Sequence, residues 1–64
     1  MSKYIDEVFE GLREVTSVSE DLAILAEAHS LLGNEKLGGD FKAMSNELKE
    51  AESKICSAVS KELN

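Results

Sequence analysis

Few residues of this 64-residue chain could carry out chemistry, because it contains only one histidine and one cysteine. His29 shares a side of a helix with Ala26 and Leu32, and a metal ion there would need at least two more converging ligands. Glu27 lies on another side of the helix, and the chain has no Glu-x-x-His pair of the kind that builds dinuclear carboxylate sites. We therefore expect no metal and no cofactor, and we expect His29 to be partly buried at a helix interface.

The remaining candidates for catalysis do not form a set either. Cys56 has no histidine and no basic cluster near it in the sequence that would activate its thiol. The acidic pairs at residues 6–7 and 20–21 are adjacent on helices, so their carboxylates diverge and cannot work together across a cleft. The sequence thus predicts no catalytic residue, and we expect that the protein is not an enzyme.

The charge balance bears on the choice of partner. Thirteen acidic residues against seven basic ones give a net charge of -6, which repels nucleic-acid phosphates and anionic membranes. Residues 1–33 carry seven acids and two bases (-5), whereas residues 34–64 carry six acids and five bases (-1). No apolar run approaches the roughly 18 residues of a membrane span, and the N-terminus lacks a signal-peptide core. These features predict a cytoplasmic protein that binds neither nucleic acid directly nor membranes.

The glycines indicate how the chain is divided into elements. There is no proline, and three of the four glycines lie within residues 33–40. Gly33 suits the end of a helix, and Asp40 suits the N-cap of another that starts at Phe41. The Gly38-Gly39 pair lacks the spacing of phosphate-binding loops. The sequence predicts one all-α domain over residues 1–64, an antiparallel helical hairpin with a helix over about 3–32, a loop over 33–40 and a helix over 41–63.

Apolar residues follow a helical repeat in both segments. In the second they recur three and four residues apart, as in a coiled coil, at Phe41, Met44, Leu48, Ala51, Ile55 and Ala58. In the first they form a seam of Ile5, Val8, Leu12, Val15, Ser19, Leu22, Ala26 and His29. Beside this seam runs a second row of Val18, Leu25 and Leu32, while Ile24 and Leu31 lie away from it. The first helix is thus apolar over a wider arc than one partner helix can cover.

Residues 17–21 leave two hypotheses open for the first helix. Ser17 and Glu20 fit a Ser-x-x-Glu capping box, so a helix could restart there and give three helices. The other hypothesis is a continuous helix whose serines face outward or toward a neighbour, because both apolar rows cross the segment without a change of phase.

The loop and the second segment resemble the small helical-hairpin co-chaperones of type III secretion needle subunits. The resemblance covers about 26 residues and consists of Gly38-Gly39-Asp40, Leu48 with Ala51, the Glu52-Ser53 pair and Ile55. It implies a hairpin that docks on a larger helical-repeat chaperone and shields a needle subunit, with residues 22–32 as the docking surface. It assigns no individual functional residue.

These observations predict a non-enzymatic, acidic protein–protein interaction module. Burying a Leu or Ile stabilises by about 1.5–3 kcal/mol, so the excess apolar surface should recruit another helix. The partner is expected to be a second copy, in a dimer or four-helix bundle, or a helical protein partner. Alternatives are the co-chaperone role and an acidic decoy that binds a basic protein. The predicted interface consists of Val18, Leu22, Ile24, Leu25, Leu31, Leu32, Leu48 and Ile55, among which Leu22, Leu25, Leu32, Leu48 and Ile55 are expected to form an intramolecular or dimeric core.

Overall fold

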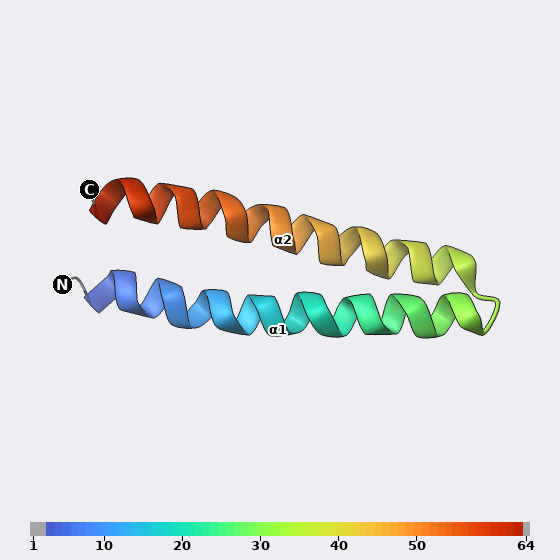
Figure 1. Cartoon of the computed structure of the whole chain (residues 1–64). Helices are drawn as coiled ribbons and strands as arrows, with labels where there is room; N and C mark the ends of the chain where they lie inside the picture. The colour runs from blue at the N-terminus through green and yellow to red at the C-terminus, as the bar shows by residue number, and fades with distance from the viewer. Residues whose placement is uncertain (1–2, 64) are drawn as a thin grey trace.

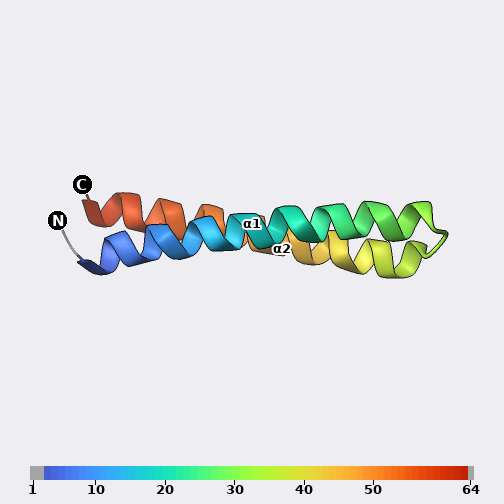
Figure 2. The same cartoon turned by 90° about the horizontal axis from the view of Figure 1, so that it is seen from below.

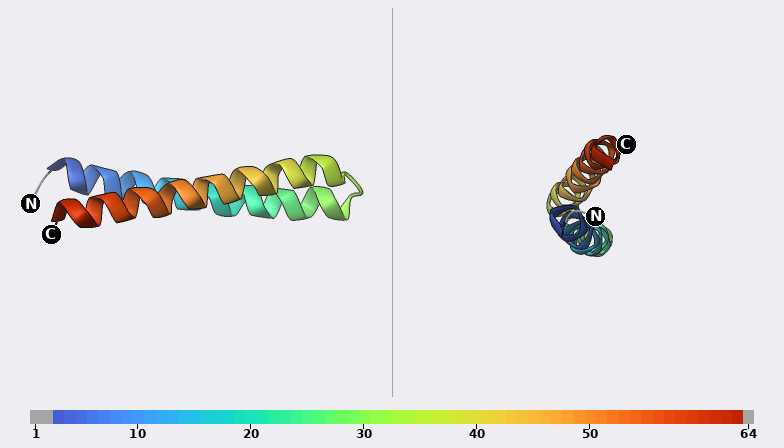
Figure 3. Two further views of the ribbon diagram at one scale, coloured as in Figure 1. Left: turned by 90° about the horizontal axis from the view of Figure 1, so that it is seen from above. Right: turned by 90° about the vertical axis from the view of Figure 1, so that its left-hand side faces the viewer.

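The computed structural model describes residues 3–63, and this part of the chain consists of two helices joined by a short turn (Figure 1). Helix α1 runs over Lys3–Leu31 and helix α2 over Glu35–Leu63, each with 29 residues. Figures 2 and 3 show the two helices running side by side in opposite directions, with both termini at the end away from the turn. The predicted all-α antiparallel hairpin is confirmed.

Gly33 ends α1 as the sequence predicts. Its φ of 83° is the left-handed conformation that glycine adopts without steric cost. The backbone N–H of Gly33 donates to the carbonyl of Ser30 (3.1 Å), and that of Asn34 donates to the carbonyl of His29 (2.8 Å). This pair of bonds is the Schellman motif, which satisfies carbonyl groups that the helix end would otherwise leave open.

The predicted loop over residues 33–40 is wrong at its second boundary, because α2 begins at Glu35 and not at Phe41. Asn34, a favoured N-cap residue, takes the place predicted for Asp40, and its carbonyl accepts the first α2 bond from Gly38 (3.0 Å). Gly38 is buried inside the helix. A Cβ atom there would lie 2.8 Å from the carbonyl oxygen of Ala26, so this glycine permits a close approach of the helices and does not mark a loop.

Helix α1 is continuous through residues 17–21, so the three-helix hypothesis is wrong. The local hydroxyl groups bond back to the helix. Ser19 Oγ donates to the carbonyl of Thr16 (2.8 Å), and Thr16 Oγ1 lies 2.9 Å from the carbonyl of Leu12. Such bonds to carbonyls three and four residues earlier let serine and threonine stay within a helix. Ser17 is exposed, whereas Ser19 is buried against α2.

The two helices meet along a narrow row that we call the seam. Its least exposed residues recur every seven positions on each helix: Leu12, Ser19 and Ala26 on α1, and Gly38, Ser45 and the half-buried Glu52 on α2. The seam predicted for α1 is confirmed in part, since three of its eight residues are buried and four are half-buried, but Val8 is exposed. The seam predicted for α2 is correct at Phe41 and Leu48, which are half-buried, but wrong at Met44, Ala51, Ile55 and Ala58, which are exposed. Ser45, Glu52 and Val59 are more buried than the residues directly before them.

The hairpin is elongated and leaves much of its surface open. Its principal extents are 49 × 16 × 10 Å, and its radius of gyration is 14.8 Å. A compact domain of this length would have a radius of gyration of about 11 Å. Only Leu12 and Ala26 among the hydrophobic residues of 3–63 are buried. The single chain therefore has almost no apolar core of its own.

Candidate interaction surface

The seam separates two long sides of the hairpin that differ in chemistry. On one side His29 of α1 stacks on Phe41 of α2, with ring centroids 5.6 Å apart. On the other side an open groove is lined by residues of both helices, among them Ala23, Lys42 and Lys49. Side chains three, four and seven residues apart share a helix face. The positions of His29 and Phe41 therefore identify the other residues of the first side, and those of the groove residues identify the second.

The side marked by the His29–Phe41 stack is an uncharged apolar surface, which we call the apolar face. On α1 it continues from His29 to residues four, seven and eleven positions earlier, and three positions later. On α2 it continues from Phe41 to residues four positions earlier and three, seven and fourteen positions later. Its members are Val18, Leu22 and Leu25 from α1, Leu32 directly after this helix, and Leu37, Phe41, Met44, Leu48 and Ile55 from α2. No Asp, Glu, Lys or Arg is among them, and the nearest charged residues, Asp21, Asp40 and Glu47, lie at the border of the face.

The structure divides the predicted interface residues between two faces. Six of them belong to the apolar face: Val18, Leu22, Leu25, Leu32, Leu48 and Ile55. The other two, Ile24 and Leu31, lie on the side of α1 turned away from α2, where they are 66% and 81% exposed. Helix geometry explains the separation, because Ile24 is two positions from the buried Ala26, a rotation of about 200°. Ile24 and Leu31 thus do not share a surface with the other six.

The five residues predicted as an intramolecular or dimeric core do not form a core within the single chain. Leu25, Leu32 and Ile55 are 44%, 81% and 41% exposed, and Leu22 and Leu48 are only half-buried. The physical reason is that the small side chains of the seam bring the helix backbones together and leave the large side chains beside the contact. The dimeric core stays a prediction.

Of the polar residues inside the seam, Ser19 was predicted from the sequence, whereas Ser45 and Glu52 were not. Ser45 Oγ donates a buried hydrogen bond of 2.7 Å to the carbonyl oxygen of Ser19. One layer further toward the termini, the Thr16 hydroxyl is also in contact with the half-buried carboxylate of Glu52. The heptad spacing of Gly38, Ser45 and Glu52 is visible in the sequence, but serine and glutamate are mostly exposed in proteins, which favours the surface for Ser45 and Glu52.

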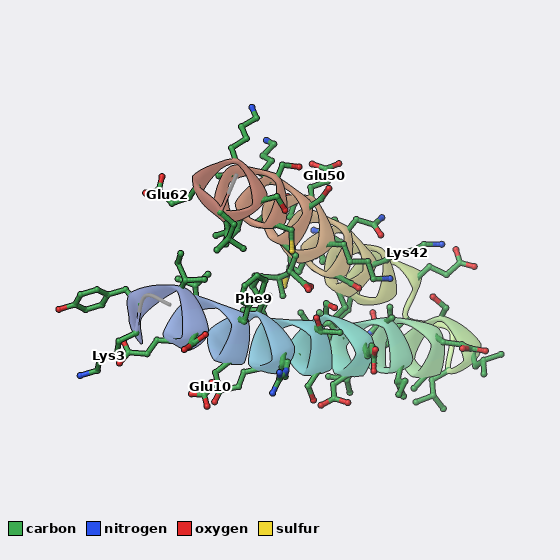
Figure 4. The ribbon with its side chains drawn as sticks, turned by 60° about the vertical axis from the view of Figure 1, so that its left-hand side comes forward. Lys3, Phe9, Glu10, Lys42, Glu50 and Glu62 are labelled. Atoms are coloured by element: carbon green, nitrogen blue, oxygen red, sulfur yellow. The ribbon has the colours of Figure 1, made fainter. Side chains whose placement is uncertain are left out.

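The groove side is polar by comparison with the apolar face. Lys42 and Lys49 from α2 and Glu27 from α1 line it together with alanines and Asn46. Cys56 lies seven residues beyond Lys49 and is exposed, so it belongs to this side. Figure 4 shows that Glu10 and Glu50 point away from the partner helix, whereas Phe9 points from α1 toward α2 near the open end of the hairpin. These charged side chains therefore lie on other sides of the hairpin than the apolar face.

Among residues 3–63, no group of three His, Cys, Asp or Glu side chains is arranged to hold a metal ion. Neither described helix has a stretch that is both long enough and apolar enough to cross a membrane.

No protein-family model matches the chain, and neither the curated proteins nor the solved structures include a significant match to it.

Proposed function

We propose that the protein is a non-enzymatic interaction module whose apolar face docks against helices of a partner. The observation that carries the proposal is the composition of this face. It runs along both helices, contains no charged side chain, and includes large residues such as Leu25, Leu32 and Met44 that remain more than two-fifths exposed. Exposed apolar surfaces with a polar border are typical of protein–protein contacts.

The weak core of the single chain supports the same proposal. A domain of this size depends on burial of apolar surface, yet the large residues of this hairpin lie beside its seam and not within it. A partner that covers the apolar face would bury Leu25, Leu32 and Ile55 and thereby stabilise the hairpin. The recognition mode is the packing of apolar helix faces at three- and four-residue spacing.

The experiment that tests the proposal is site-specific photo-crosslinking in cells that produce the protein. A benzoylphenylalanine is placed at position 25 on the apolar face, and at position 24 on the outer side of the same helix as the control. We expect a covalent protein adduct from position 25 and little or none from position 24. The proposal fails if position 25 gives no adduct, or if the two positions give the same adducts in equal amounts.

A further inference from the structure

We propose that the occupant of the apolar face is a second copy of this chain, so that two hairpins form a four-helix bundle. This inference rests on the proposed function, since it names the partner of the same face. Three observations carry it: the amount of surface that the single hairpin leaves open, the chemistry of the face, and the way in which the face repeats on both helices.

The exposed area matches what a dimer would bury. The accessible surface is 4949 Å², whereas a compact monomer with the chain's mass of 7.0 kDa exposes about 4000 Å². The excess of about 900 Å² is close to the roughly 800 Å² that one partner contributes to an interface of standard size. One further copy therefore suffices to return the chain to the exposure of a compact protein.

The chemistry of the face selects an uncharged apolar partner. The chain has a net charge of -6, but none of the residues that make up the apolar face is Asp or Glu; Asp21, Asp40 and Glu47 lie at its border, and Glu10 and Glu50 point away from the partner helix in Figure 4. A basic protein attracted by the net charge would thus bind the carboxylates on the other sides of the hairpin and not the apolar face. A second copy offers the same uncharged leucine-rich surface, and two such surfaces bury each other without leaving any charge unpaired.

The arrangement of the face allows it to pair with itself. Val18, Leu25 and Leu32 recur every seven residues along α1 and the residue that follows it, and Phe41, Leu48 and Ile55 do so on α2. The face therefore presents two parallel rows of heptad-spaced residues. A twofold rotation lays these two rows over the same two rows of the other copy, as in the isologous interface of a symmetric dimer. Four helices packed around such rows form a bundle.

Sedimentation equilibrium of the purified, reduced protein over a wide range of concentrations tests the inference. Leu31 and Leu32 form a matched pair, since both are 81% exposed in the single chain and only Leu32 lies on the apolar face. Leu32 also keeps its helical position, because its N–H donates to the carbonyl of Ala28 (3.1 Å). We expect twice the chain mass for the wild type and for Leu31→Asp, and the single-chain mass for Leu32→Asp at concentrations where the wild type is fully dimeric.

A second pair repeats the comparison within α1, with Leu25→Asp expected to dissociate the dimer and Ile24→Asp expected to preserve it. If Leu25→Asp loses its helical circular dichroism, the Leu32→Asp variant still tests whether the hairpins dimerise through the apolar face. The Leu32 side chain is largely exposed in the single chain, so its replacement should not unfold the hairpin. A helical wild type with the single-chain mass at every concentration overturns the inference, as does equal dissociation by Leu31→Asp and Leu32→Asp. If the purified protein is monomeric but position 25 still forms an adduct with another protein, the proposal of a second copy is wrong and the proposed docking function stands. If position 25 forms no adduct at all, the proposed docking function is wrong as well.

Discussion

The hydroxyl group of Ser45 on α2 donates a 2.7 Å hydrogen bond to the backbone carbonyl oxygen of Ser19 on α1, and both serines are only 1% exposed. A side chain of one helix thus touches the backbone of the other. Such a contact requires small residues on both helices, and it explains why the large apolar residues lie beside the seam. The same closeness makes the hairpin sensitive to the size of a few side chains.

Enlarging Ser45 should weaken the hairpin. A leucine at this position has no space and must push the helices apart, so Ser45→Leu is expected to lower the free energy of unfolding by about 1–3 kcal/mol. Urea unfolding followed by circular dichroism measures the change. Ser53→Leu is the control, because Ser53 is exposed on the same helix and should tolerate the substitution. Equal stability of the two variants would show that the seam is not closely packed.

The two adjacent glycines of α2 should respond in opposite directions to alanine. At Gly38 a Cβ atom meets the Ala26 carbonyl oxygen at 2.8 Å, so Gly38→Ala is expected to destabilise by about 1–2 kcal/mol. At Gly39 a Cβ atom meets nothing within 4 Å, and Gly39→Ala is expected to stabilise the helix by about 0.5–1 kcal/mol. Thermal unfolding at one fixed concentration compares the two variants. If Gly38→Ala also stabilises, residues 35–40 do not pack against α1 as described.

Removing the Thr16 hydroxyl should cost stability because it contacts the half-buried Glu52 carboxylate. Thr16→Val keeps the shape of the side chain but takes away the hydrogen-bond donor, and it is expected to lower the free energy of unfolding by about 1 kcal/mol. The neighbouring Ser17 is exposed, so Ser17→Ala serves as the control and should change little. An unchanged denaturation midpoint for Thr16→Val would mean that this contact adds nothing to the hairpin.

Much of the fold could be predicted from the sequence, because its main signals are local. The helical spacing of apolar residues predicted both helices, and Gly33 marked the end of the first. The start of α2 could not be predicted in this way, since Gly38 is conformationally ordinary and matters only through its distance from Ala26 on the other helix. Local sequence does not contain such tertiary distances.

The rotational phase of α2 was missed for a related reason. The prediction placed Met44 and Ala51 in the seam, whereas the structure places Ser45 and Glu52 there. Hydrophobicity favours Met44 over Ser45, but closely packed helices favour the smaller residue at the point of contact. Glu52 is larger than Ala51, and its place in the seam goes with the contact between its carboxylate and the Thr16 hydroxyl. The apolar face was predicted in large part, since six of the eight interface residues share it, and the helical spacing already placed Ile24 and Leu31 away from the seam.

Cys56 provides a test of which side of the hairpin is covered. It is exposed on the groove side, in the row of Lys42 and Lys49, and not on the apolar face. Its reaction with a thiol reagent such as dithionitrobenzoate should therefore proceed at the same rate in the dimer as in the monomeric Leu32→Asp variant. Strong protection of this thiol at high wild-type concentration would place the interface on the groove side.

The most direct test of the central claim, that the apolar face is completed by a second copy, is the concentration dependence of the thermal unfolding midpoint. Because mass action favours an associated native state at higher concentration, the wild-type midpoint should rise as the protein is concentrated. The midpoint of Leu32→Asp should not change, and that of Leu31→Asp should follow the wild type. A wild-type midpoint that is independent of concentration, together with full helicity, would contradict the account.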